Sequence, residues 1–237
     1  ITGDVIDEGD NCDASLDATY TDTVTNGACD GKLIIARNWS LMDEGGNTTT
    51  QEQIISVTDT TKPTFTQPAD ITIYKDSNCI YDASPTITGD VTDEGDNCDA
   101  SMDAAFTDVV TSETCEGKRV ITRNWSLVDD CGNTTTHEQI ITIIDTIHPT
   151  FTGPADTTIY KDSNCTYDAS AAITGDVTDE GDNCDASLEA TYSDVMGNGT
   201  CEDELIITRT WSLTDDCGNT TENVQIISVI HDVEIGG

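Results

Sequence analysis

The sequence has very few basic residues: 9 Lys and Arg stand against 46 Asp and Glu, for a formal net charge of -37. Nucleic-acid phosphates and anionic membrane surfaces are bound by clusters of Lys and Arg, so the chain is predicted to bind neither. Long apolar runs are also lacking, and no stretch reaches the roughly 18 residues that a membrane span requires. A signal-peptide pattern is missing as well, and Ile1 is therefore expected to begin a mature or cut-out segment.

Aromatic residues are scarce too, at 5%, and only 35% of the residues are hydrophobic. This composition approaches that of disordered chains, because little apolar surface is available to offset the entropy cost of folding. The chain does, however, contain ten cysteines. Disulfides are therefore the first candidate for the stabilisation that a small core does not supply.

The sequence repeats itself with a period of 86 residues, which separates Trp39, Trp125 and Trp211. Residues 1–86 match residues 87–172 at 60 of 86 positions without a gap. A repeat of this length predicts tandem structural modules rather than one large domain.

Short proline-containing junctions divide the repeat into modules at 1–60, 61–146 and 147–237. The first module has no counterpart of residues 62–86, which are predicted to contain the opening strand. Either the chain is cut from a longer array, which is the simpler interpretation, or a neighbour donates that strand.

Strands are the predicted secondary structure within each module. Ile121, Arg123, Trp125 and Leu127 alternate with polar residues, which is typical of a strand with one apolar face. Further β-branched runs and Gly-Asn turns follow, and no stretch has a helical period. The sequence predicts an all-β protein of tandem immunoglobulin-like β-sandwich modules in an extended array.

A complete module has four cysteines, and Gly45 replaces the fourth in the first module. If the fourth cysteine paired with either of those that the first module retains, this module would carry a stranded thiol. Zinc is the competing interpretation, but the spacings are unlike those of zinc sites. Disulfides imply an oxidising, extracellular location. The predicted pairs are Cys12–Cys29, Cys98–Cys115, Cys184–Cys201, Cys79–Cys131 and Cys165–Cys217.

An acidic loop recurs in every module and contains no cation. Because crowded carboxylates repel one another, a bound cation is expected, and calcium prefers such oxygen ligands. The alternative is a solvated acidic face whose Asp and Asn side chains cap turns. A second acidic pair, Asp129-Asp130 in the second module, follows the Trp strand. The calcium candidates are Asp4, Asp7, Glu8, Asp10, Asp13, Asp90, Asp93, Glu94, Asp96, Asp99, Asp176, Asp179, Glu180, Asp182 and Asp185, with Asp59 and Asp145 at module ends.

Catalysis is not expected. The acidic loop occurs three times, whereas enzymes seldom triplicate a catalytic site in tandem copies. The three histidines occupy no recurring position, and nucleophile motifs and phosphate-binding loops are missing. An arginine does recur two residues before each Trp, as Arg209 does before Trp211. Its expected role is structural, stacking on the indole or pairing with an inward Asp.

Four motifs recur together: Asp-Asn-Cys, Arg-x-Trp-Ser-Leu, Asp-x-Cys-Gly-Asn-Thr and the junction Asp-x-x-x-Pro-x-Phe. With these motifs the chain resembles the four-cysteine HYR-like (hyalin-repeat-related) domains, immunoglobulin-like units of long Bacteroidota surface proteins. The resemblance implies a secreted or cell-surface adhesin or filament. The implied partners are neighbouring modules of the same long chain, with self-assembly into a fibre as an extension. Gly45 and residues 231–237 depart from the pattern.

The same resemblance raises O-glycosylation, because Asp-Ser/Thr followed by an aliphatic residue or Thr is an acceptor pattern in such proteins. It occurs at Thr23, Thr60, Thr146 and Thr157.

Two functions remain. The leading hypothesis is a structural and adhesive repeat segment that calcium and disulfides make rigid. The alternative is a calcium-dependent glycan-binding module, which would need exposed aromatic side chains for stacking on sugars. Tyr74, Tyr81, Tyr160 and Tyr167 are the remaining candidates, and we expect them to pack in cores or on edge strands instead.

Overall fold

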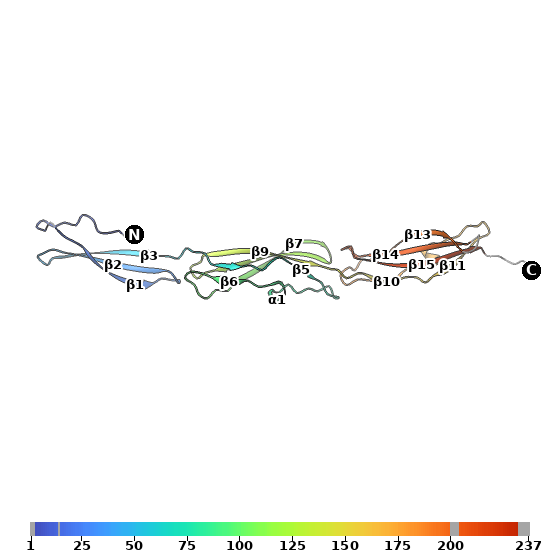
Figure 1. The fold of residues 1–237 in the computed structure, drawn as a ribbon, viewed down its shortest axis with the longest axis horizontal. Coiled ribbons are helices and arrows are strands. Elements are labelled where there is room, and N and C mark those ends of the chain that lie inside the picture. Colours follow the sequence, from blue (N-terminus) through green and yellow to red (C-terminus); the bar gives the residue numbers. More distant parts are fainter. Residues whose placement is uncertain (1–2, 14, 200–203, 232–237) are drawn as a thin grey trace, which may run out of the picture. The chain divides into compact units, whose positions relative to one another are not determined.

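A computed structural model describes residues 3–13, 15–199 and 204–231 of the chain. Within these residues the protein is built from β-strands, and its two helices are single turns. The prediction of an all-β protein is therefore confirmed (Figure 1). The strands are β1 (Thr19–Asn26), β2 (Leu33–Met42), β3 (Thr48–Val57), β4 (Thr64–Thr66), β5 (Ile71–Tyr74), β6 (Thr92–Gly95), β7 (Ala105–Cys115), β8 (Lys118–Val128), β9 (Thr134–Ile144), β10 (Thr150–Thr152), β11 (Thr157–Lys161), β12 (Thr178–Gly181), β13 (Thr191–Asn198), β14 (Leu205–Thr214) and β15 (Thr220–His231); the helices are α1 (Pro85–Thr88) and α2 (Ala171–Thr174).

Each of the two complete modules has a four-stranded sheet and a two-stranded sheet. The four-stranded orders are β5-β9-β8-β7 and β11-β15-β14-β13, and the small sheets are β4-β6 and β10-β12. β5 and β11 run parallel to β9 and β15, whereas β13, β14 and β15 are antiparallel. Two sheets that share a core make the immunoglobulin-like sandwich that the strand pattern predicted.

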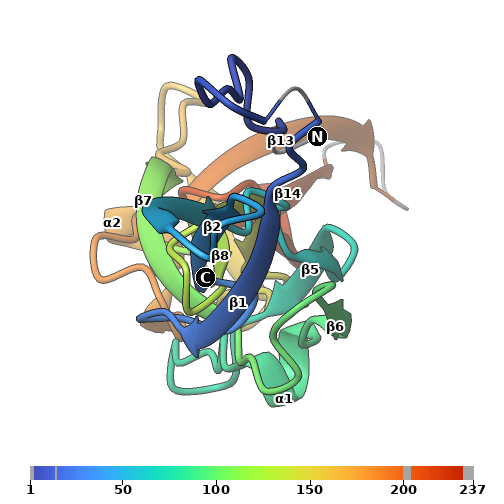
Figure 2. The same ribbon diagram turned by 90° about the vertical axis from the view of Figure 1, so that its left-hand side faces the viewer.

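The first module has only the three-stranded sheet β1-β2-β3 among the described residues. Its antiparallel register is continuous, from Thr19 opposite Ser40 to Asn26 opposite Leu33. β1 is one long twisted ribbon in Figure 2, as expected for an edge strand of a right-handed twisted sheet. The sequence of the first module lacks the segment that forms β4 and β5 in the second.

By contacts, the described chain forms two compact units whose limits fall inside the second module. One comprises residues 1–68, 90–107 and 123–139, and the other comprises 69–89, 108–122 and 140–237. β7, β8 and β9 contribute residues to both units. The module boundaries at 60 and 146 thus remain a prediction from the sequence repeat.

The cores are small clusters of aliphatic and aromatic side chains. In the first unit Phe65, Trp125 and Leu127 form one buried cluster. In the second unit, one cluster combines isoleucines of β5, β8 and β9, and another combines residues of β11, β14 and β15. These residues lie at alternate positions of their strands, because successive side chains point to opposite faces of a sheet.

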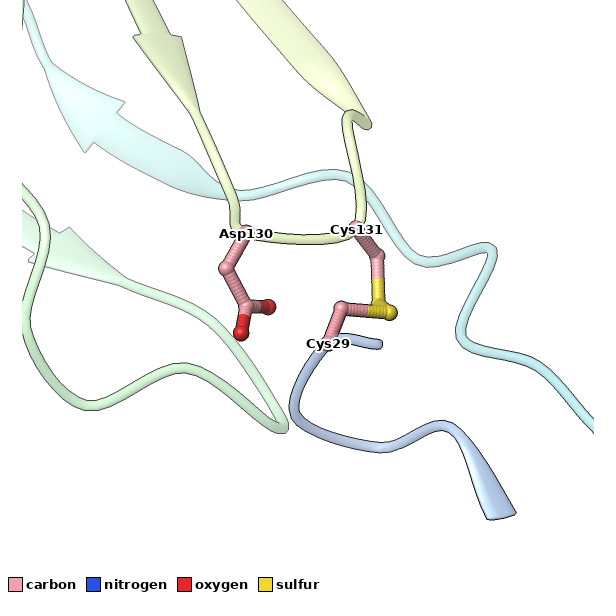
Figure 3. A group of neighbouring side chains, drawn as sticks. All are labelled: Cys29, Asp130 and Cys131. Atoms are coloured by element: carbon pink, nitrogen blue, oxygen red, sulfur yellow. A yellow bond between two sulfur atoms is a disulfide. The ribbon is translucent and has the colours of Figure 1, made fainter. Parts of the chain in front are cut away.

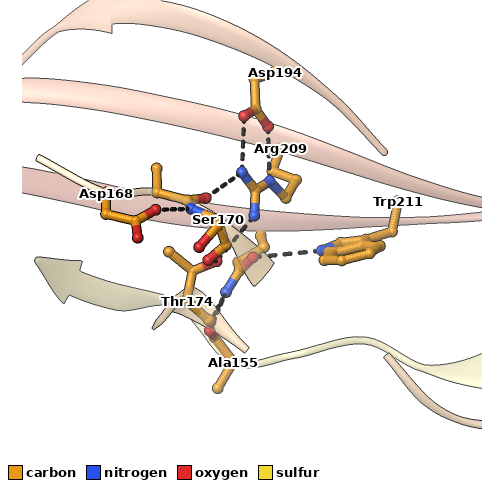
Figure 4. Close-up of polar contacts among 9 residues, drawn as sticks. Ala155, Asp168, Ser170, Thr174, Asp194, Arg209 and Trp211 are labelled. Atoms are coloured by element: carbon orange, nitrogen blue, oxygen red, sulfur yellow. Dashed lines mark hydrogen bonds and ion pairs between the residues drawn. The ribbon is translucent and has the colours of Figure 1, made fainter. Parts of the chain in front are cut away.

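The recurring arginine completes the core of the third module (Figure 4). Arg209 is 1% exposed and pairs with Asp194 through two hydrogen bonds of 2.8 Å. It also donates to Thr174 Oγ1 and lies over the ring of Tyr192. The hydrogen bonds that Arg209 donates to the Asp194 carboxylate raise the pKa of Arg209. The structural role predicted for this arginine is confirmed.

Candidate functional site

Disulfides join successive modules in this protein. In the second unit Cys115 and Cys79 of the middle module bond to Cys217 and Cys184 of the third. In the first unit, Cys29 of the first module bonds to Cys131 of the second. The bonded residues are 102 or 105 positions apart, which exceeds the 86-residue repeat.

The predicted pairs within modules were wrong, and the strand directions explain why. Cys165 follows β11, whose last residue lies opposite His231 at the end of the parallel strand β15. Cys217 lies in the turn before β15 begins. A strand of 12 residues is about 40 Å long, whereas the Cα atoms of a disulfide lie within about 7 Å. The bridges Cys29–Cys131, Cys79–Cys184 and Cys115–Cys217 replace the predicted pairs Cys12–Cys29, Cys98–Cys115, Cys184–Cys201, Cys79–Cys131 and Cys165–Cys217.

Cys184 lies at the same end of the third module as Cys217. It precedes β13, whose first residue Thr191 pairs with Ser212 close to the β14–β15 turn. Cys184 and Cys217 of the third module therefore lie at the end of that module where they bond to Cys79 and Cys115 of the middle module. Cys12, Cys98 and Cys165 are free thiols, and Cys201 lies outside the described residues.

An aspartate beside each of two bridges holds the facing loop. Figure 3 shows Asp130 next to the Cys29–Cys131 bond, and its Oδ2 accepts the backbone N–H of Asp30 at 2.7 Å. The same contact recurs in the second unit, where Asp216 Oδ2 accepts the N–H of Glu116 at 2.7 Å. Each of these junctions thus has a covalent bond and a charge-assisted hydrogen bond side by side.

Three carboxylates converge between the middle and third modules, within the second unit. Asp145, Asp182 and Asp215 each offer an oxygen atom, and these atoms lie within 4.8 Å of one another. Asp145 and Asp215 are 6% and 5% exposed. Asp145 ends the middle module, whereas the other two belong to the acidic loop and to the turn of the third.

Several oxygen atoms of this cluster are buried without a hydrogen-bond partner: Asp145 Oδ2, Asp182 Oδ1 and Asn183 Oδ1. The Asn183 amide nitrogen, by contrast, donates to Asp145 Oδ1 at 3.2 Å and to the carbonyl of Asp76 at 3.1 Å. Buried carboxylate oxygens without a donor are costly, and their mutual repulsion adds to this cost. A set of oxygen donors alone fits calcium or magnesium and disfavours zinc.

The first unit has a related cluster with a thiol in it. Asp59, Asp96 and Cys98 form a group of the same kind, and Asp96 Oδ1 is buried without a partner. The backbone N–H of Thr61 is the main cause that lowers the pKa of Asp59. Burial, and then the charge of Asp59, raise the pKa of Cys98, which keeps it a thiol.

The sequence predicted some of the residues of these two clusters. It selected Asp145, Asp182, Asp59 and Asp96 but did not place Asp215 among the ligands. Asn183 was also missed. Both missed residues recur at the repeat period, within the Asp-x-Cys-Gly-Asn and Asp-Asn-Cys motifs, and that signal could have found them.

Most of the other predicted calcium ligands cap turns instead, which agrees with the alternative interpretation of the acidic loop. In the first module Asp10 and Asp13 still line an open cavity of about 350 Å³ together with Asp43. The carboxylates of Asp4, Asp90 and Asp176 accept the next backbone N–H; those of Glu8, Glu94 and Glu180 accept an N–H ten residues ahead; those of Asp13, Asp99 and Asp185 accept the N–H two residues ahead. Asp7, Asp93 and Asp179 are exposed and have positive φ angles near 60°.

One of these turn-capping contacts, outside the acidic loop, predicts a pH dependence. Asp162 accepts the backbone N–H groups of Thr166 and Asn164, and these bonds lower its pKa, that from Thr166 most. A lowered pKa in the folded state means stabilisation above the ordinary carboxyl pKa of about 3.9, lost as the pH falls through the lowered value. Asp162→Ala is therefore expected to lower the melting temperature at pH 7. The difference from the wild type should close as the pH falls below about 4, in parallel thermal scans. A difference that persists unchanged at pH 2 would contradict this.

The predicted glycosylation sites and the tyrosines are not members of the two carboxylate clusters. Thr23, Thr60 and Thr146 are exposed, and Thr157 is half-buried in β11. Tyr81 and Tyr167 pack against the cores, whereas Tyr74 and Tyr160 are 61% and 58% exposed on the edge strands.

The histidines make structural contacts where these are resolved. His137 packs edge-on against Phe65, and His148 Nδ1 lies 2.7 Å from the carbonyl of Thr220. In the part of the chain that the structure describes, no helix is long and apolar enough to cross a membrane.

No family model matches the sequence, and no curated protein matches it either. Among solved structures, the chain is similar to Drosophila N-cadherin EC1–4, with 11% identity, 93% of this chain and 67% of that chain covered, and a TM-score of 0.31. Mouse cadherin-23 EC22–24 has 15% identity, coverage of 90% and 86%, and a TM-score of 0.30. Protocadherin gammaB7 EC3–6 has 10% identity, coverage of 93% and 67%, and a TM-score of 0.33.

Proposed function

We propose that this chain is a structural segment of a long extracellular adhesin or filament, built from repeats of the HYR-like type. The observation that carries the proposal is the set of disulfides between successive modules. A bond within a module would stabilise only that module. A bond between modules instead limits how far the chain lengthens when one of them unfolds, which is useful in a chain under tension.

The bonds also interlock along the sequence. The spans 29–131, 79–184 and 115–217 overlap, so that the middle module is fastened to both neighbours. Such bonds form and persist in oxidising surroundings, which supports an extracellular location. The chain repeats one module without a recurring histidine or nucleophile, which supports a role without catalysis.

Calcium at Asp145, Asp182 and Asp215 is the second part of the proposal. The unpartnered oxygens of Asp145, Asp182 and Asn183 are the ligands that a hard cation prefers, and a divalent ion would offset the repulsion between the carboxylates. The near-complete burial of Asp145 and Asp215 supports a structural ion over a glycan-binding one, since a sugar must reach the metal itself.

Pulling the chain from its two ends tests the proposal. Without bonds, 237 residues extend to roughly 800 Å. With the bonds between modules intact, the shortest covalent path between the pulled ends crosses two of the bridges and omits most of the sequence. The fully extended length should then be roughly a quarter of the length without bonds. Bonds within modules would instead leave roughly half. Single-molecule force spectroscopy separates the three lengths.

Reductant provides the internal control, because it should restore the full length in the same molecules. A variant with Cys12→Ser and Cys165→Ser removes two exposed free thiols that could exchange with the bridges. It should behave as the wild type does. An extended length of half or more for the oxidised wild type would reject the proposal that disulfides join successive modules.

A further inference from the structure

The sheet of the first module has an outer edge that no strand covers in the described part of the chain. In the complete modules this edge is taken by β5 or β11, which pair in parallel with β9 or β15. The first module has no counterpart beside β3. As a result Val57 is 41% exposed, whereas Ile143, its equivalent one repeat later, is fully buried. An uncovered edge of this kind can accept a strand from elsewhere.

A pocket lies beside the tryptophan of the same module. It is about 160 Å³ in volume and is lined by Trp39, Leu41, Val5 and Ile6 among others. One repeat later the core cluster around the tryptophan includes Phe65 of β4, and Trp125 is 1% exposed. Trp39, which has no such phenylalanine within its own module, is 8% exposed.

A free thiol is the third feature. Cys98 and Cys184 have the same local setting: the preceding asparagine donates its amide to the sulfur, and the aspartate two residues before accepts the cysteine N–H. Cys184 is bonded to Cys79, which follows β5, whereas Cys98 is free. Cys98 also lines a cavity of about 480 Å³ at the end of the β1–β2 hairpin, together with Cys29 and Asp130.

From these three features we infer that the first module and Cys98 form an acceptor for an opening strand of this same repeat. The occupant would lie parallel to β3, place a phenylalanine beside Trp39 and form a disulfide with Cys98. The repeat supplies that pattern: Phe65, Ile73 and Cys79 are spaced by eight and six residues, as are the corresponding residues of the third module. In the middle module those same three residues fill the equivalent pocket, core and bridge.

The covalent step is thiol–disulfide exchange. The Cys98 thiol loses its proton to solvent, and the thiolate attacks the sulfur of a strand that arrives as a mixed disulfide with a small thiol. The small thiol leaves as thiolate, so one disulfide is consumed and one is formed.

The test uses the full chain and a synthetic peptide of the sequence of residues 62–84, with its cysteine activated as a mixed disulfide with thionitrobenzoate. Release of the coloured thiolate gives the rate, and mass spectrometry of tryptic fragments gives the site. Docking raises the local concentration of the peptide, so Cys98 should react at least about tenfold faster with it than with a scrambled peptide of the same composition. The exposed Cys12 and Cys165 should not distinguish the two peptides.

A non-covalent readout keeps the inference testable if exchange is blocked. The peptide with Cys79→Ser should still change Trp39 fluorescence in a variant where Trp125 and Trp211 are replaced by phenylalanine. It should do so less when Phe65 of the peptide is replaced by aspartate. Equal rates at Cys98 for native and scrambled peptides, together with no fluorescence change, would overturn the inference. Neither result bears on the three bridges between modules, so the proposed function is tested separately.

Discussion

The variant Cys115→Ser/Cys217→Ser is expected to lose about 2 to 4 kcal/mol of unfolding free energy relative to the oxidised wild type. The bond closes a span of 102 residues, and long closed loops restrict the unfolded chain most. It also lies where the two modules meet, beside the hydrogen bond between Asp216 and Glu116. Urea unfolding of both proteins, followed by tryptophan fluorescence, measures the difference.

Cys165→Ser is the matched control, because Cys165 is exposed and unbonded. Its unfolding curve should coincide with that of the wild type. Under reductant the double variant and the wild type should become equal. If the double variant is as stable as the oxidised wild type, the Cys115–Cys217 bond does not fasten the junction.

Calcium at millimolar concentration is expected to stabilise the wild type by about 2 to 3 kcal/mol if it exceeds the dissociation constant about a hundredfold. Asp145→Asn/Asp182→Asn should lose most of the response from this junction, because two of three converging charges are removed. In chelator the same variant should be no less stable than the wild type, since the unneutralised repulsion is relieved as well. Thermal scans with calcium and with chelator give all four values.

Asp179→Asn is the control for charge alone. It removes one acidic-loop carboxylate that is exposed and lies outside the cluster, at a positive φ angle that asparagine tolerates. Its calcium response should match that of the wild type. A full response in the double variant, or a lost response in the Asp179 variant, would place the ion elsewhere in the acidic loop.

The fold was accessible from the sequence because its signals are local. The alternation around Trp125 predicts a strand with one buried face, and the 86-residue period predicts several modules rather than one large domain. The disulfide pairing was not accessible in the same way. Gly45 led to the prediction of pairs within modules, because the first module lacks both the cysteine at this position and the counterpart of Cys79. In the observed pattern the cysteines at this place of the repeat, Cys131 and Cys217, bond to the module before their own, so a glycine here strands no thiol within its module.

Strand direction is the information that the cysteine spacing lacked. β11 runs parallel to β15, and this places Cys165 and Cys217 at opposite ends of the module. A parallel pair in an otherwise antiparallel sheet requires a crossover, which depends on tertiary packing and leaves no mark in the spacing. The metal centre was partly predicted for a related reason: the repeat singled out Asp145 and Asp182, but only the folded junction joins them to Asp215.

Disulfide mapping tests the account most directly. The protein is alkylated under acid conditions without reductant, digested, and its linked peptides are identified by mass spectrometry. The account predicts linked peptides for Cys29–Cys131, Cys79–Cys184 and Cys115–Cys217, with alkylated Cys12, Cys98 and Cys165. Linked peptides for Cys98–Cys115 and Cys79–Cys131 would contradict it, because each of the three bridges between modules would then lack one of its cysteines.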